Sequence, residues 1–359
     1  MERIKENLLF LMQNGKTIKF LDRTFNIKKD FTISVFDFIL QHHKEGNIFQ
    51  FEITADILHA DIIKYINEKV PKQLFRFEIG IQSVNTATNL EVSRKQSFEK
   101  TKSIIKAIDN NIEMHLDLIV GLPYETMELT KQGFEEVFAL FGPELQLGFL
   151  KFLKGTPMRD KIEKHGYSFD ENPPYQIIKS NYLNESELND LLILESALEI
   201  YWNKKRSINT LKYITKTSSI FDSLMEIGKL FQTKKNLHKH TLEDAFDVMH
   251  DWILDKYPND FVLMQMHNID YAIYNKIRPG NRYNHFFHIH DSKRINTIEN
   301  NYQLVQKMKY ASIAINFDYE LWKNETKVNL HDNTLLFCYD GISLPKLIID
   351  NSLINLPHQ

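Results

Sequence analysis

Short β-prone runs alternate with longer stretches of helical periodicity over roughly the first 155 residues of the chain. The predicted strands are Thr17–Leu21, Ile48–Thr54, Phe75–Gln82, Ile112–Val120 and Leu145–Leu153. The predicted helices are Arg3–Asn14, Phe36–Lys44, Ile57–Val70, Ser97–Asn110 and Leu129–Phe141. The strand centres lie about thirty residues apart, which is the length of one β-α-β unit. Such an alternation favours a parallel sheet that curls toward a barrel through right-handed crossovers.

Polar residues occupy every second position in two of the predicted strands. These positions are Arg76, Glu78 and Gln82 in the third strand, and Glu113, His115 and Asp117 in the fourth. Alternate residues of a strand lie on the same face of the sheet. The interior of a parallel barrel is normally packed with branched apolar side chains. The alternation therefore indicates a wet or ligand-bearing lumen.

The alternation of strands and helices ends near Pro173–Pro174. Asn184 with Glu187 predicts the start of a helix, and Thr241 with Asp244 predicts another. The predicted helical blocks are Leu188–Lys204, Lys216–Phe231 and one from Thr241, and from Asp270 the chain reads as β-prone, with strands at Ala311–Phe317 and Thr334–Tyr339. We therefore predict two domains, a partial barrel over 1–175 and a helical, then β-containing domain over 176–359.

Composition places the chain among ordinary globular proteins. It has 359 residues, 43% of them hydrophobic, and a net charge of −3. This charge predicts no nucleic-acid partner. No apolar run reaches the roughly 20 residues that a membrane span needs, and no signal peptide is recognisable, so we expect a cytoplasmic protein without a membrane partner.

Cysteine ligands are scarce in the sequence. Cys338 is the single cysteine, and one thiol cannot form an intramolecular disulfide, a cysteine-rich zinc site or an iron–sulfur cluster. In the stretch His285–Asp291, His288 and His290 would share one strand face, but a metal site normally needs a third ligand. We predict no metal site.

Several segments carry a recognisable resemblance. They are Ile79–Ser83 followed by Arg94, His115–Pro123, Lys151–Pro157 and Phe20–Asn26. In this order and at this spacing they resemble the strands of radical S-adenosylmethionine (SAM) enzymes, and Phe20–Asn26 resembles the second strand of the cobalamin-binding members. Pro173–Tyr175 and the following helices resemble an uncharacterised domain that follows the barrel in one subgroup. The resemblance implies an α/β fold, a partial parallel (β/α) barrel of the radical SAM type whose first strand is missing, followed by a mainly helical α+β domain.

The resemblance also implies a SAM-binding site. Glu52 matches the carboxylate that holds the ribose or the methionyl amine, and Gln82 matches a polar residue that faces the ribose. Arg94 matches the basic residue that meets the SAM carboxylate, and Asp117 matches a residue near the ribose hydroxyls.

The residues themselves also allow structural roles for these side chains. Arg94 could be a surface helix arginine, and Glu52 could pair with Lys19 or Arg76. Asp117 could cap the following turn.

The chain departs from the family at the metal cluster. Radical SAM chemistry requires a [4Fe–4S] cluster on a C-x-x-x-C-x-x-C loop after the first strand, and this sequence lacks that loop. We expect the chain to start just after the loop, with an upstream segment or a separate chain supplying the first strand, the cysteine loop and a cobalamin domain.

The predicted function is accordingly that of a radical SAM protein fragment. Cobalamin and the [4Fe–4S] cluster are expected only in the intact family member, and SAM is expected to bind weakly here. Whether the chain is an enzyme stays open, and no catalytic residue is assigned. The alternative is a free-standing, non-catalytic binding or scaffold protein derived from a radical SAM enzyme.

Overall fold

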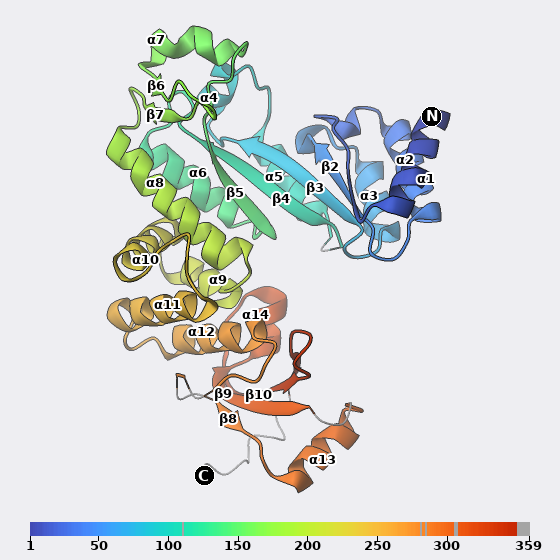
Figure 1. The fold of residues 1–359 in the computed structure, drawn as a ribbon, viewed down its shortest axis with the longest axis vertical. Helices are drawn as coiled ribbons and strands as arrows, with labels where there is room; N and C mark the ends of the chain where they lie inside the picture. Colours follow the sequence, from blue (N-terminus) through green and yellow to red (C-terminus); the bar gives the residue numbers. More distant parts are fainter. Residues whose placement is uncertain (110, 281, 284–285, 305–307, 350–359) are drawn as a thin grey trace. The chain divides into compact units, whose positions relative to one another are not determined.

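The chain forms two compact units, Met1–Glu195 and Ser196–Gln359, in the computed structural model (Figure 1). The structure describes residues 1–109, 111–280, 282–283, 286–304 and 308–349. Asn110, at the end of one predicted helix, and His285, in the histidine-rich stretch, lie outside these residues. The domain limits of 1–175 and 176–359 stay a prediction.

The first unit contains a parallel sheet. Its strands are β1 (Thr17–Lys19), β2 (Ile48–Ile53), β3 (Phe75–Gln82), β4 (Glu113–Val120) and β5 (Glu144–Phe149). They lie side by side in sequence order, and every neighbouring pair is parallel. Strands β2 to β5 are labelled in Figure 1. The helices before and between them are α1 (Glu2–Asn14), α2 (Lys29–His42), α3 (Ala60–Lys69), α5 (Phe98–Ala107) and α6 (Met127–Phe138). Sequential strand order with helical crossovers is the topology of a partial β/α barrel.

The two faces of this sheet differ in polarity. Burial alternates residue by residue along β2, β3 and β4, so that one face is buried and the other is partly exposed. On the buried face, the ring of Phe36 from α2 lies 5.1 Å from Phe51 and 4.7 Å from Phe75, measured between centroids. Aromatic contacts of this kind add to the free energy gained by apolar burial. The partly exposed face carries the polar alternation predicted from the sequence, and we call it the polar face.

Short elements follow the carboxyl ends of the strands. They are η1 (Phe25–Ile27), η2 (Ala55–Ile57), α4 (Thr86–Glu91), η3 (Pro157–Lys161), α7 (Ile162–His165), β6 (Ser168–Phe169) and β7 (Ile177–Lys179), and α8 (Glu185–Leu198) comes after them. Ser97, the first residue of the predicted helix, caps α5 by accepting a hydrogen bond from the Lys100 N–H. Gly121 follows β4 with φ 86°, where a Cβ would lie 2.7 Å from Cδ1 of Ile177.

The second unit packs helices against an antiparallel sheet. It contains η4 (Glu199–Asn203), α9 (Ile208–Thr217), α10 (Ile220–Lys234), α11 (Leu242–Lys256), α12 (Phe261–Tyr274), β8 (Phe287–His288), α13 (Ser292–Asn301), β9 (Lys309–Phe317), α14 (Tyr319–Glu325), β10 (Leu330–Tyr339) and β11 (Lys346–Ile349). The strand order is β11-β10-β9-β8. The larger core joins α11 and α12 to β9 and β10, and a smaller core lies under α13. The predicted fold class, a partial parallel barrel followed by a mainly helical α+β region, is confirmed.

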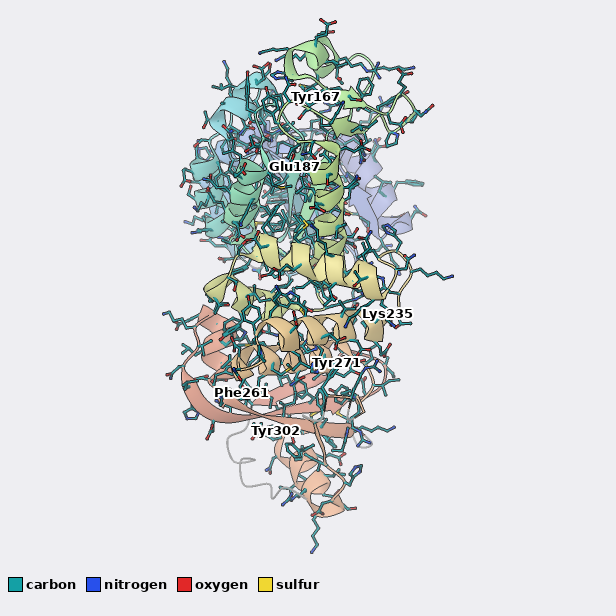
Figure 2. All side chains as sticks on the ribbon, turned by 90° about the vertical axis from the view of Figure 1, so that its left-hand side faces the viewer. Tyr167, Glu187, Lys235, Phe261, Tyr271 and Tyr302 are labelled. Atoms are coloured by element: carbon teal, nitrogen blue, oxygen red, sulfur yellow. The ribbon has the colours of Figure 1, made fainter. Side chains whose placement is uncertain are left out.

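Two predicted boundaries in the second unit are wrong. The block Lys216–Phe231 is two helices, because α9 ends at Thr217 and Ser219 caps α10 by accepting from the Asp222 N–H. The segment from Asp270, predicted to be β-prone, is helical at its start, because α12 continues to Tyr274. Within α12, Tyr271 is 5% exposed while Phe261 is 69% exposed; both are labelled in Figure 2. The capping box of Thr241 and Asp244 is present as predicted.

Among the described residues, no helix has both the length and the apolar composition that a membrane crossing requires.

Candidate functional site

The end of β3 has an unusual backbone. Gln82, its last residue, has φ 68°, and the pairing of β3 with β4 shifts between Gly80 and Gln82. A positive φ is uncommon outside glycine, and such outliers cluster at ligand sites. The Gln82 side chain folds back over Gly80, where a Cβ would lie only 2.6 Å from Nε2 of Gln82 and 3.3 Å from Nη2 of Arg94. The missing side chain at position 80 therefore makes room for the amide and the guanidinium.

Arg94 lies between α4 and α5 and is partly buried, so it is not a surface helix arginine. Its Nη2 donates to the Gly80 carbonyl, and its Nε donates to Oε1 of Gln96 at 2.5 Å. Burial lowers the pKa of Arg94, against the opposing charges of Asp56 and Asp117. The guanidinium is thus held at the end of β3 by the Gly80 carbonyl and the Gln96 amide, where the charges of Asp56 and Asp117 act on it.

Asp117 belongs to the body of β4 and is paired in register with Gly80. It therefore lies inside the strand and does not cap the turn that follows. Its Oδ1 lies 3.1 Å from Nε2 of His115. The structure thus brings three of the predicted site residues, Gln82, Arg94 and Asp117, together around Gly80.

Glu52 lies apart from this group. It is paired in register with Glu78 on the polar face, two residues before Gly80 along β3. The two cations considered as its partners are engaged elsewhere: Lys19 Nζ lies 2.9 Å from Glu78, and Arg76 Nη2 lies 2.6 Å from Glu144. Within the described part of the chain, Glu52 has no side-chain hydrogen bond or ion pair. The structure leaves its carboxylate available on the polar face but not in contact with Arg94.

Two carboxylates near the site were missed by the sequence reasoning. Asp56 in η2 is 8% exposed and its charge acts on Arg94. Glu125, in the turn after β4, is 5% exposed and accepts a hydrogen bond from Ser83 Oγ. Burial raises the pKa of Glu125. The only sequence signal for both residues is an acidic residue shortly after a predicted strand.

An ionic cluster fixes α4 beside the site. Glu91, the last residue of α4, lies 2.9 Å from Lys161 Nζ, 2.8 Å from Lys164 Nζ and 3.2 Å from His165 Nε2. Hydrogen bonds from these partners lower the pKa of Glu91. The cluster links α4 to α7. Since the Arg94 N–H donates to the Asn89 carbonyl in α4, it also steadies the chain that carries Arg94.

The residues present do not fit a [4Fe–4S] cluster. The single cysteine, Cys338, lies on β10 in the second unit and is 2% exposed. Over the described residues, no group of three or more His, Cys, Asp or Glu side chains is placed to hold a metal ion. His288 and His290 have ring centroids 6.1 Å apart, and β8 ends at His288.

The chain resembles several known proteins in part. Residues 163–337 match a family described as a protein of unknown function, DUF4080. The uncharacterized protein YtqA of Bacillus subtilis (strain 168) is 27% identical over 121 residues, which are 33% of this chain and 38% of YtqA. The chain thus aligns with well under two thirds of that relative.

The similar solved structures include radical SAM enzymes. The Escherichia coli coproporphyrinogen III oxidase HemN, a radical SAM enzyme, has a TM-score of 0.31 and 18% identity over 35% of this chain and 30% of HemN. The radical SAM methyltransferase TsrM of Kitasatospora setae, with cobalamin and a [4Fe–4S] cluster bound, has a TM-score of 0.39 and 12% identity over 50% of this chain and 37% of TsrM. Elp3 of Methanocaldococcus infernus has a TM-score of 0.41 and 12% identity over 97% of this chain and 78% of the Elp3 structure.

Proposed function

We propose that the first unit binds SAM at the carboxyl ends of β3 and β4. The observation that carries this proposal is the convergence of the Gln82 amide and the Arg94 guanidinium over Gly80, whose register partner on β4 is Asp117. Oε1 of Gln82 is buried and has no hydrogen-bond partner among the described residues. A buried polar atom without a partner is costly unless a ligand or water satisfies it. These features fit a small ligand with several polar groups.

Each side chain matches one polar group of SAM. The Arg94 guanidinium suits the methionyl carboxylate, because its planar fork matches a carboxylate geometrically. Gln82 and Asp117 suit the ribose hydroxyls, and the unpaired Glu52 suits the methionyl amine. When bound, SAM supplies an activated methyl sulfonium or, in the intact family member, a 5′-deoxyadenosyl group. Since one cysteine cannot hold the cluster, the proposal for these 359 residues is binding without radical chemistry.

Isothermal titration with SAM tests the assignment of Arg94. Wild-type protein should bind SAM at micromolar to millimolar concentrations, and Arg94→Ala should weaken the affinity about tenfold to a hundredfold. This range corresponds to the roughly 1.5–3 kcal/mol of a hydrogen bond between charged groups. Arg3→Ala, which removes an exposed arginine of α1, is the matched control and should bind as the wild type does. No heat with wild-type protein at millimolar SAM, or equal affinities for Arg94→Ala and wild type, would contradict the proposal.

Gly80→Ala tests the packing of the Gln82 amide and the Arg94 guanidinium over Gly80. The new Cβ would lie 2.6 Å from Nε2 of Gln82 and 3.3 Å from the guanidinium, so both side chains must move. We expect SAM affinity to fall about tenfold while the melting temperature changes little, because only the ends of flexible side chains are displaced. Gly280→Ala is the control, since a Cβ there meets nothing within 4 Å. Unchanged affinity in Gly80→Ala would contradict SAM binding at this end of β3.

A further inference from the structure

His115 lies on the polar face of β4 and contacts charged residues of both neighbouring strands. On β4 it is paired in register with Glu78 of β3 and with Glu144 of β5. Its Nε2 lies 3.1 Å from Oδ1 of Asp117, and its Nδ1 lies 2.9 Å from Nη2 of Arg76. His115 therefore contacts Asp117 on its own strand and the charged residues Arg76 and Glu144 on the two neighbouring strands.

The tautomer of His115 follows from these contacts. A guanidinium can only donate, so Nδ1 accepts from Arg76 and the neutral ring carries its proton on Nε2. Nε2 lies 3.1 Å from Oδ1 of Asp117, a close contact that lacks hydrogen-bond geometry. Oδ1 of Asp117 therefore lies against the imidazole of His115.

Charged groups from three strands face the imidazole. Arg76 and Glu78 come from β3, Glu113 and Asp117 from β4, and Glu144 from β5; Oε1 of Glu144 is 3.7 Å from Nδ1. Burial lowers the pKa of His115, but the nearby carboxylate of Asp117 and the charge of Glu144 outweigh this effect, so its pKa is raised above the ordinary value. The ring therefore gains its proton at a higher pH than a free histidine does.

We propose that His115 is a positioning residue that fixes the Asp117 carboxylate and makes ligand affinity at this site depend on pH. This inference rests on the proposed SAM site and deepens it. Protonation of His115 adds a positive charge beside Asp117. SAM itself is cationic at its sulfonium and amine, so the charged ring should oppose its binding. Affinity should then rise as the pH increases through the pKa of His115.

The test compares three proteins by SAM titration between pH 6 and pH 9. At pH 8, His115→Ala should weaken SAM binding about tenfold, because the Asp117 carboxylate loses its contact with the imidazole. His115→Gln, whose amide can still donate to Asp117, should restore affinity to within about threefold of wild type. At each pH, the dissociation constant of wild type is divided by that of His115→Gln. This ratio should be about threefold to tenfold larger at pH 6 than at pH 8. That ratio cancels the titration of the SAM amine, and the expected size follows from a unit charge acting at short range.

The outcomes separate this inference from the SAM site. If wild type does not bind SAM, the proposed SAM site and the inference about His115 are both wrong. If wild type binds and Arg94→Ala does not, but His115→Ala matches wild type with the same pH profile, the site stands and the role of His115 is overturned. Histidine NMR gives a readout that needs no ligand: the resonance missing in His115→Gln should titrate at lower pH in Asp117→Asn than in wild type. An unchanged titration would contradict the His115–Asp117 contact.

Discussion

Replacing Asp270 by alanine should lower the free energy of unfolding by about 4 kcal/mol, because the carboxylate serves several buried donors. Asp270, on α12, accepts from Asn209 N and Nδ2 at 3.0 and 2.8 Å, and from Thr210 N and Oγ1 at 2.8 and 2.7 Å. It thus occupies the N-terminus of α9, where a negative charge is favourable. Burial raises the pKa of Asp270 to about 6, against these hydrogen bonds, which favour the ionised form. Each buried donor left without a partner costs roughly 1–3 kcal/mol.

Urea denaturation of the full chain at pH 7.5 measures this effect. Asp291→Ala is the matched control, since Asp291 caps α13 at an exposed position by accepting from the Lys293 N–H. Loss of an exposed cap should cost about 1 kcal/mol. Equal destabilisation by the two substitutions would show that water replaces the contacts of Asp270 and that α9 does not depend on them.

The strands of the first unit could be predicted closely from local pattern. Phe75–Gln82 is predicted and observed with the same ends, and the other observed strands begin within one residue of their predicted starts. These strands are bounded by turns, and their alternation of polar and apolar residues follows the two faces of the sheet. Helix starts were less predictable where no side chain caps the helix. α2 begins at Lys29 after an uncapped Lys28, whereas the pattern placed its start at Phe36.

The helices of the second unit were harder to predict from the sequence, because tertiary contacts bury residues that would otherwise form a polar stripe. α12 is buried over most of its surface, so its sequence lacks the polar stripe that marks a surface helix. Asp270 is polar, yet it lies in the interior because its partners come from α9, far away in the sequence. α9 begins at Ile208 after Ser207, whose side chain makes no capping hydrogen bond. No local feature of the sequence indicates that Asn209 and Thr210 contact Asp270.

The candidate site shows the same division between local and long-range information. Motif order identified Gln82, Arg94 and Asp117, and the structure brings them together because Gly80 and Asp117 are paired in register. The contact of His115 with Asp117 follows from their positions on one strand face, but its links to Arg76 and Glu144 depend on strand pairing. Glu52 matched its motif as well as the others did, yet its register places it beside Glu78. Pairing register therefore decides which motif residues share a site.

Cys338 should react with a thiol reagent more than about a thousandfold more slowly in the native protein than in the unfolded chain. The side chain lies on β10 and is 2% exposed, within a small core that includes Tyr310, Leu336 and Ile348. Burial raises the pKa of the Cys338 thiol from 9.0 to about 12, although Lys346 opposes this shift. Since the thiolate is the reactive form, three pH units correspond to a thousandfold smaller reactive fraction before any steric protection is counted.

The measurement is absorbance after addition of an aromatic disulfide at pH 8, with and without denaturant, and it is unambiguous because the chain has one thiol. A matched control carries Ser292→Cys together with Cys338→Ser. Ser292 is exposed at the start of α13, so this thiol should react at nearly the same rate in native and unfolded protein. Native Cys338 labelled as fast as the control would show that β10 opens to solvent. Slow labelling would mean that the chain's one thiol stays protonated and enclosed, so that thiolate ligands for an iron–sulfur cluster would have to come from outside these 359 residues.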